Sequence, residues 1–135
     1  MTMRMLLLAA IAAAGLSACE TATEPRERTV QQQQSYDRLL AGKTAGNAER
    51  CLPTYRSEDM TVIDDNTILF RDGRTVYVNN PPGGCHLLGR GNYALVTRSV
   101  GGLGLCRGDI ATVVDTSSGI TVGSCSLGDF VPYRS

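Results

Sequence analysis

The clearest indication of the fold is the stretch TVIDDNTILFRDGRTVYVNN, residues 61–80. It consists of short apolar runs separated by the residues that favour tight turns. The runs on either side of Asp64-Asp65-Asn66 predict a strand, a turn and a second strand. Asp72-Gly73 then gives the strongest hairpin signal in the chain, and the next strand is expected over Thr75–Asn79. These twenty residues therefore predict three consecutive antiparallel strands.

The same pattern continues toward the C-terminus. Further strands are expected over Tyr93–Arg98, Ile110–Val114 and Ile120–Ser124, with a glycine-rich loop over Gly101–Gly104 between the first two of them. No helical period lies between these short runs. The spacing predicts an all-β fold, a small antiparallel sandwich or barrel of five to six strands.

The cysteines lie around this stretch and indicate how the strands are held together. The chain has five, and four of them, Cys51, Cys85, Cys106 and Cys125, lie in the β-rich part. An even number in an oxidising compartment predicts two disulfides, and four cysteines allow three pairings. If successive strands run alternately up and down one axis, Cys106 meets Cys125 at one end, which leaves Cys51 to pair with Cys85.

The N-terminus carries a different signal. Met5–Gly15 is an apolar stretch of eleven residues, shorter than the roughly 20 that span a bilayer. Leu16-Ser17-Ala18-Cys19 follows it and resembles the lipobox of bacterial lipoproteins. The resemblance implies cleavage before Cys19 and lipid attachment to its thiol; the alternative is an ordinary secretory signal cleaved after Ala18. Membrane contact is therefore expected through an N-terminal lipid.

We expect three segments: a signal peptide over 1–18, a lipid-anchored linker over 19–50, and a disulfide-stabilised β domain over 51–135. The linker is polar and has few large apolar residues, which is typical of a flexible tether. One short helix is expected within it, over Val30–Leu40, ended by Gly42 and Gly46.

Composition excludes several classes of function. The formal net charge is zero, which argues against a nucleic-acid partner. The domain cysteines lack the close spacing of zinc ligands, so no metal site is expected. The spacing in Gly102-Leu103-Gly104 does not match a dinucleotide-binding loop, so no cofactor is expected. The tripeptide Arg107-Gly108-Asp109 is interpreted as a turn in which the Asp109 carboxylate accepts hydrogen bonds from nearby backbone N–H groups.

Catalytic residues are scarce. His86 is the only histidine and Lys43 the only lysine, so a Ser-His-Asp triad has a single candidate base and no nucleophile elbow accompanies it. A non-catalytic binding or structural module is therefore the favoured interpretation. The alternative is a small periplasmic hydrolase that uses His86 with nearby carboxylates; the candidates are Asp64, Asp65, Asp109 and Asp129.

Four segments resemble an uncharacterised family of small proteobacterial envelope proteins: CLPTYRSEDMTVIDDNTILF, VYVNNPPGGCHLLG, LCRGDIATVVD and SCSLGDFVPY. The resemblance implies a signal peptide or lipobox and a shared disulfide-bearing domain, but no activity or ligand. The pair His86-Leu87 departs from the turn expected after the cysteine. The lipobox predicts a location in the bacterial envelope, lipid-anchored and facing the periplasm. For a binding or structural module, the expected partner is another envelope protein or a cell-wall component. Glu20 after Cys19, where Asp would signal inner-membrane retention, favours the outer membrane.

Overall fold

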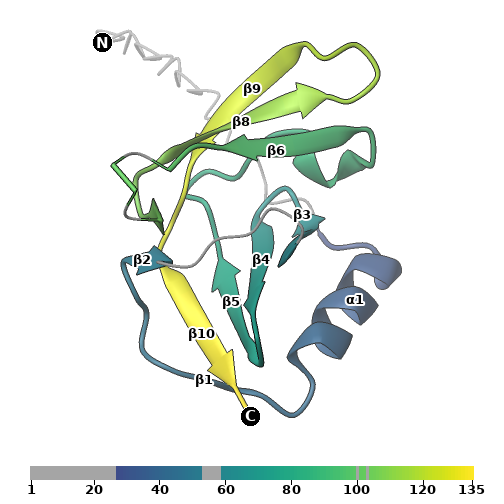
Figure 1. Ribbon diagram of the computed structural model, residues 1–135. Coiled ribbons are helices and arrows are strands. Elements are labelled where there is room, and N and C mark those ends of the chain that lie inside the picture. The colour runs from purple at the N-terminus through teal and green to yellow at the C-terminus, as the bar shows by residue number, and fades with distance from the viewer. Residues whose placement is uncertain (1–26, 53–58, 100, 103) are drawn as a thin grey trace, which may run out of the picture.

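The computed structural model describes residues 27–52, 59–99, 101–102 and 104–135. Within these ranges the chain forms three antiparallel sheets, one α-helix and one short 3-10 helix (Figure 1). The predicted all-β antiparallel class with two disulfides is confirmed. The elements in chain order are α1 Val30–Leu40, β1 Thr44–Ala45, β2 Cys51–Leu52, β3 Met60–Asp64, β4 Thr67–Asp72, β5 Thr75–Asn79, η2 Leu88–Arg90, β6 Tyr93–Thr97, β7 Leu105–Cys106, β8 Ile110–Asp115, β9 Thr121–Ser126 and β10 Phe130–Arg134.

The large sheet has the strand order β1-β10-β5-β4-β3. The pair of hairpins predicted from residues 61–80 forms β3, β4 and β5, with β3 at one edge of the sheet. Asp72 pairs with Thr75 across the β4–β5 turn, and Gly73 takes a positive φ of 59° there, which glycine adopts at no steric cost. The two hairpins place β3, β4 and β5 side by side, as the sequence predicts.

The small sheet has the order β6-β8-β9. Tyr93 pairs with Asp115, so the β8–β9 turn lies at the end of the sheet where β6 begins. Figure 1 shows that the strands of the small sheet run across those of the large sheet. Between β7 and β8 the chain turns at Arg107-Gly108-Asp109, where the Cys106 backbone N–H donates to Asp109 Oδ2 at 2.8 Å. The interpretation of this tripeptide as a locally bonded turn is confirmed.

The chain passes from the small sheet to the large one between β9 and β10, and a buried amide holds this crossing. Asn79 Nδ2 donates to the Gly128 carbonyl at 2.8 Å, and the Gly128 N–H donates to Asn79 Oδ1 at 2.9 Å. Asn79 has no exposed surface, so both ends of its amide are satisfied inside the protein. A Cβ on Gly128 would lie 2.5 Å from the Asn80 carbonyl oxygen, so only glycine fits at this crossing.

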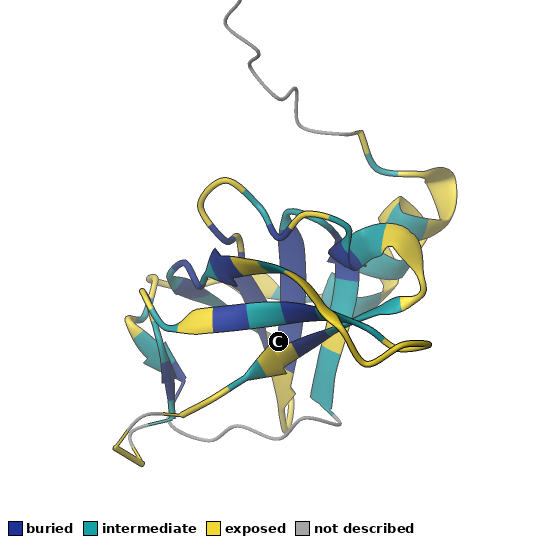
Figure 2. Cartoon of the chain, turned by 90° about the horizontal axis from the view of Figure 1, so that it is seen from above, coloured by how far each residue is buried: buried dark blue, intermediate teal, exposed yellow. Residues whose placement is uncertain are grey.

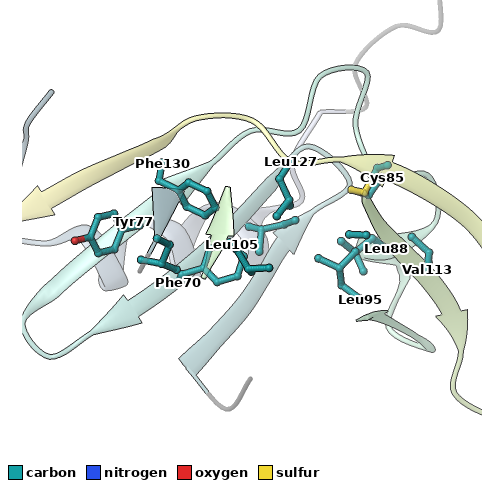
Figure 3. Close-up of a cluster of buried hydrophobic side chains, with 13 residues drawn as sticks. Phe70, Tyr77, Cys85, Leu88, Leu95, Leu105, Val113, Leu127 and Phe130 are labelled. Carbon is teal, nitrogen blue, oxygen red and sulfur yellow. A yellow bond between two sulfur atoms is a disulfide. The ribbon is translucent and has the colours of Figure 1, made fainter. Parts of the chain in front are cut away.

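The main core fills the space between the two sheets (Figure 3). The large sheet contributes Phe70 from β4 and Phe130 from β10, whose ring centroids lie 5.6 Å apart with an interplanar angle of 61°. This edge-to-face arrangement is one that aromatic pairs prefer. The small sheet contributes Leu95 and Val113, and each of these four side chains is almost fully buried.

The two disulfides join Cys51 to Cys106 and Cys85 to Cys125. All four domain cysteines are paired, but the expected pairing of Cys106 with Cys125 and of Cys51 with Cys85 is wrong. Cys51 and Cys106 are direct partners of the two-stranded β2–β7 ladder, with Cα atoms 3.9 Å apart. The prediction failed because the sheets cross: one up–down axis cannot describe both, and β9 carries Cys125 over the loop that holds Cys85.

The helix α1 occurs at the predicted residues, but it is not part of a free linker. Thr29 caps it in a reciprocal capping box with Gln32. Its residues are half-buried or exposed (Figure 2), and one side packs on the large sheet. The helix contributes Tyr36, Leu39 and Leu40 to a second apolar cluster with Ile63, Leu69, Val76 and Val78.

The domain therefore begins earlier than residue 51. After α1, β1 pairs with the C-terminal strand β10, with Thr44 opposite Arg134, and Arg134 Nη2 donates to Glu49 Oε1 at 3.0 Å. The assignment of residues 27–50 to a flexible linker is wrong, because these residues cover one face of the sheet and extend its edge. The expected signal peptide and Cys19 lie outside the described residues.

Candidate functional site

A polar cleft of about 320 Å³ opens where the described chain begins. Three segments line it: the start of α1, the β3–β4 turn and the 3-10 helix η2. The lining residues are Glu27, Thr29, Gln32, Asp64, Asp65, Gly89 and Arg90. Because three carboxylates and one guanidinium line it, this cleft is the candidate for a catalytic or ligand-binding site.

Asp64 is buried and held by Arg28. Arg28 Nε donates to Asp64 Oδ2 at 2.6 Å, and Arg28 Nη2 donates to Thr67 Oγ1 at 2.8 Å. The guanidinium also lies 4.2 Å from the centre of the Tyr36 ring, a distance suited to a cation–π contact. The second oxygen of Asp64 accepts the Asn66 backbone N–H at 2.7 Å. Both oxygens of this carboxylate are thus used to hold the turn and to fasten the start of α1.

Asp65 is also used structurally. Its Oδ1 accepts the Gly89 N–H at 2.7 Å, and its backbone carbonyl accepts the Cys85 N–H at 2.6 Å. A Cβ on Gly89 would lie 2.9 Å from Asp64 Cα, so η2 sits as close to the turn as glycine permits. Asp64 and Asp65 therefore join three segments, and the structure does not set them up as an acid–base pair.

The hydrolase alternative needs His86 beside a carboxylate, and the structure does not bring them together. His86 is exposed, lines neither the cleft nor the hollow described below, and has no hydrogen bond or ion pair with any other described residue. Asp109 closes the β7–β8 turn, and Asp129 Oδ2 accepts from Arg107 Nη1 at 3.3 Å. The carboxylates named with His86 are each bonded elsewhere.

Among the described residues, three side chains have shifted pKa values, each with a local cause. Burial raises the pKa of Tyr36, and a hydrogen bond with Tyr133 adds to this. A hydrogen bond from the Ser117 hydroxyl lowers the pKa of Asp115, and a hydrogen bond to Glu49 raises that of Arg134. These groups lie on α1, at the β8–β9 turn and on β10 respectively, and none lines the cleft.

Sequence reasoning missed a second surface, the outer face of the small sheet. Val96, Ile110 and Val122 lie on it with 44, 62 and 41% of their surface exposed, and Ile120, 63% exposed, lies at the adjoining hairpin turn. We call these four residues the apolar face. Next to it, a hollow of about 610 Å³ is lined by Val96, Arg98, Gly108, Asp109, Ile110, Thr112 and Thr121.

The sequence of β8 carries no signal for this face, because its apolar residues at 110, 111, 113 and 114 do not alternate with polar ones; the alternation appears only in the burial of the strand. Ala111 and Val113 point into the core, so Ile110 and Thr112 point the other way. In most proteins, large aliphatic residues on the solvent side of a strand are exposed singly and not in groups. Here one occurs on each of the three strands of one sheet, so the outer face carries an exposed aliphatic residue on every strand.

Across the described ranges, no set of three or more His, Cys, Asp or Glu side chains is arranged to hold a metal ion. Neither helix in the same part of the chain has the length and apolar character needed to cross a membrane. No family model, curated protein or solved structure matches the chain.

Proposed function

We propose that this chain is a lipid-anchored protein of the bacterial envelope, and that its domain binds or scaffolds another envelope component. The observation that carries the proposal is the use of the cysteines. The four domain cysteines pair with one another, which accounts for four of the five cysteines in the sequence, and the fifth is Cys19. It is also the cysteine that follows Leu16-Ser17-Ala18, where a lipoprotein carries its lipid.

Two further features support the proposal. Disulfides persist in oxidising compartments such as the periplasm, which fits export of the domain. The carboxylates named as catalytic candidates bond to turns or form ion pairs, and none faces His86. This favours a binding or structural role for the domain. The resemblance to small envelope proteins fits the same proposal. Because Glu20, and not Asp, follows Cys19, we propose the outer membrane as the location.

Metabolic labelling with palmitate, followed by mass spectrometry of the membrane form, tests the proposal. We expect a mature chain that begins at Cys19 and carries a lipid adduct, and loss of the label in Cys19→Ser. The matched control is the double variant Cys51→Ser/Cys106→Ser, which removes two other cysteines and keeps the label. A wild-type chain that begins at Glu20, or one that is soluble and unlabelled, would overturn the proposal.

A further inference from the structure

The structure shortens the tether between the proposed lipid and the domain. Glu27 already lines the cleft, and it lies eight residues after Cys19. Eight residues span at most about 29 Å when fully extended. A linker that reached residue 50 could have spanned about 110 Å by the same rule.

This length is comparable with the size of the domain itself. A domain of about 110 residues has a radius of gyration near 13 Å, and hence a width of about 30–35 Å. If Cys19 is acylated, the domain cannot move away from the bilayer by more than about its own width. Part of its surface therefore faces lipid head groups at close range.

The exposed apolar residues identify which surface that is. Of the described residues, the large hydrophobics that are exposed are Val30, Val96, Ile110, Ile120 and Val122. Val30 is the first residue of α1, at the root of the tether. The other four form the apolar face.

Hydrogen bonds place the β8–β9 turn, with Ile120 beside it, near the tether root. Arg90 lines the same cleft as Glu27. Two residues further on, the Asn92 carbonyl accepts both the N–H and the hydroxyl of Thr116, at 3.0 and 2.9 Å. The β8–β9 turn, and Ile120 with it, is thus fastened close to where the tether enters. Figure 1 shows the start of α1 and the β8–β9 turn on the same side of the molecule, and the β4–β5 turn at the other end.

One arginine beside this face suits an anionic surface. Arg98 is exposed and forms no ion pair with another described residue, while the Asp109 carboxylate in the same hollow is bonded to the Cys106 backbone N–H. Arg98 borders the hollow beside Val96 and Ile110. Exposed aliphatic residues with a basic side chain at their edge are typical of surfaces that bind at the head-group level of a bilayer.

We propose that the apolar face of the small sheet rests on the bilayer that holds the lipid of Cys19. The lipid and the face then form two contacts with one membrane, and together they orient the domain with the β4–β5 turn pointing away. This inference rests on the proposed lipid anchoring, because the short tether is what brings the face to the membrane.

Tryptophan fluorescence can test the orientation, since the chain contains no Trp. The face probe is Ile110→Trp, at an exposed position where a larger side chain meets no core. The matched control is Arg74→Trp, at the exposed β4–β5 turn. Each full chain is purified from membranes and reconstituted into vesicles of phosphatidylethanolamine and phosphatidylglycerol with brominated or ordinary acyl chains. Val122→Trp serves as a second face probe if Ile110→Trp fails to fold.

We expect bromine to quench the face probe at least about twofold more strongly than the control, because interfacial side chains enter the acyl boundary by about 5–10 Å. Equal quenching of the two probes in lipidated, vesicle-bound protein overturns the inference and leaves the proposed function intact. Mass spectrometry of Cys19 in the same samples reports on the proposed function separately. If it shows no lipid, the proposed function and the inference both fall.

Discussion

The two main sheets of this domain differ in how they are covered. The large sheet packs on the main core with one face and under α1 with the other. The small sheet packs on the same core with its inner face, while its outer face leaves Val96, Ile110 and Val122 exposed. The difference shows that the helix covers only one of two apolar sheet surfaces, and that the domain folds with the second surface open.

The burial of the residues within each strand differs in the same way. In β4 the four residues Thr67, Ile68, Leu69 and Phe70 are all buried, because both faces of that strand are covered. In β8 only Ala111 and Val113 are buried. A continuous apolar run is typical of a strand buried on both faces, and alternation is typical of a strand with one solvated face.

The largest expected effect separates the shared core from the open face. Phe130→Ala removes a fully buried ring that packs on Phe70, so we expect a loss of about 3–5 kcal/mol in the free energy of unfolding. Ile110→Ala is the control on the open face, with an expected change within about 0.5 kcal/mol. Urea unfolding followed by circular dichroism measures both. A large loss in Ile110→Ala would show that the outer face is covered in solution.

The second prediction concerns the covalent link between the small sheet and the rest of the domain. The double variant Cys85→Ala/Cys125→Ala should lose about 2–4 kcal/mol in the free energy of unfolding, because the missing disulfide closes a long loop, with a sequence separation of 40. Hydrogen exchange in this variant should rise more in β8 and β9 than in β4 and β5. Uniform exchange would mean that the core alone holds the small sheet.

Peptide mapping of the wild-type protein should recover Cys51 with Cys106 and Cys85 with Cys125.

The cover of the large sheet can be tested through α1. Leu39→Ala removes a half-buried side chain from the cluster under the helix, and we expect a loss of about 1–2 kcal/mol. Val30→Ala on the same helix is the control, since Val30 is 73% exposed, and its effect should stay within about 0.5 kcal/mol. Thermal melts compare the two. Equal melting temperatures of the two variants would mean that α1 does not pack on the large sheet in solution.

The smallest effect is expected at the turn of the small sheet. The Ser117 hydroxyl and backbone lower the pKa of Asp115 in the folded protein, so Ser117→Ala should raise it toward its ordinary value. A depressed pKa stabilises the fold above the unfolded pKa, and this contribution disappears as the pH falls through the folded pKa. Carboxyl NMR titration measures the shift. An unchanged pKa in the variant would mean that the backbone N–H groups of Ser117 and Ser118 carry the whole effect.

Much of this fold could be predicted because its signals are local. The helix over Val30–Leu40, the strand over Thr75–Asn79 and the β8–β9 hairpin depend on capping residues, turn residues and alternation that a short window contains. The role of α1 could not be predicted in the same way. Whether this helix packs on the sheet depends on contacts between distant parts of the sequence. One of them is the pairing of β1 with β10, in which Thr44 lies opposite Arg134.

The candidate sites were less predictable than the fold. Asp64 and Asp65 were visible as paired acids, but their partners Arg28 and Gly89 are 36 and 24 residues away. The cysteine pairing failed for a related reason, since it depends on the angle at which two sheets cross. The apolar face needed knowledge of which side of β8 faces the core.

The order of the two disulfides along the chain has a consequence for proteolysis. The bridges interleave: Cys85 lies between Cys51 and Cys106, and Cys106 lies between Cys85 and Cys125. A protease that cuts once anywhere between residues 51 and 125 therefore leaves two fragments that are still covalently joined. A nicked molecule keeps its mass on a non-reducing gel and separates only after reduction. With sequential bridges, a single cut between residues 85 and 106 would have released the C-terminal half from whatever holds the N-terminus.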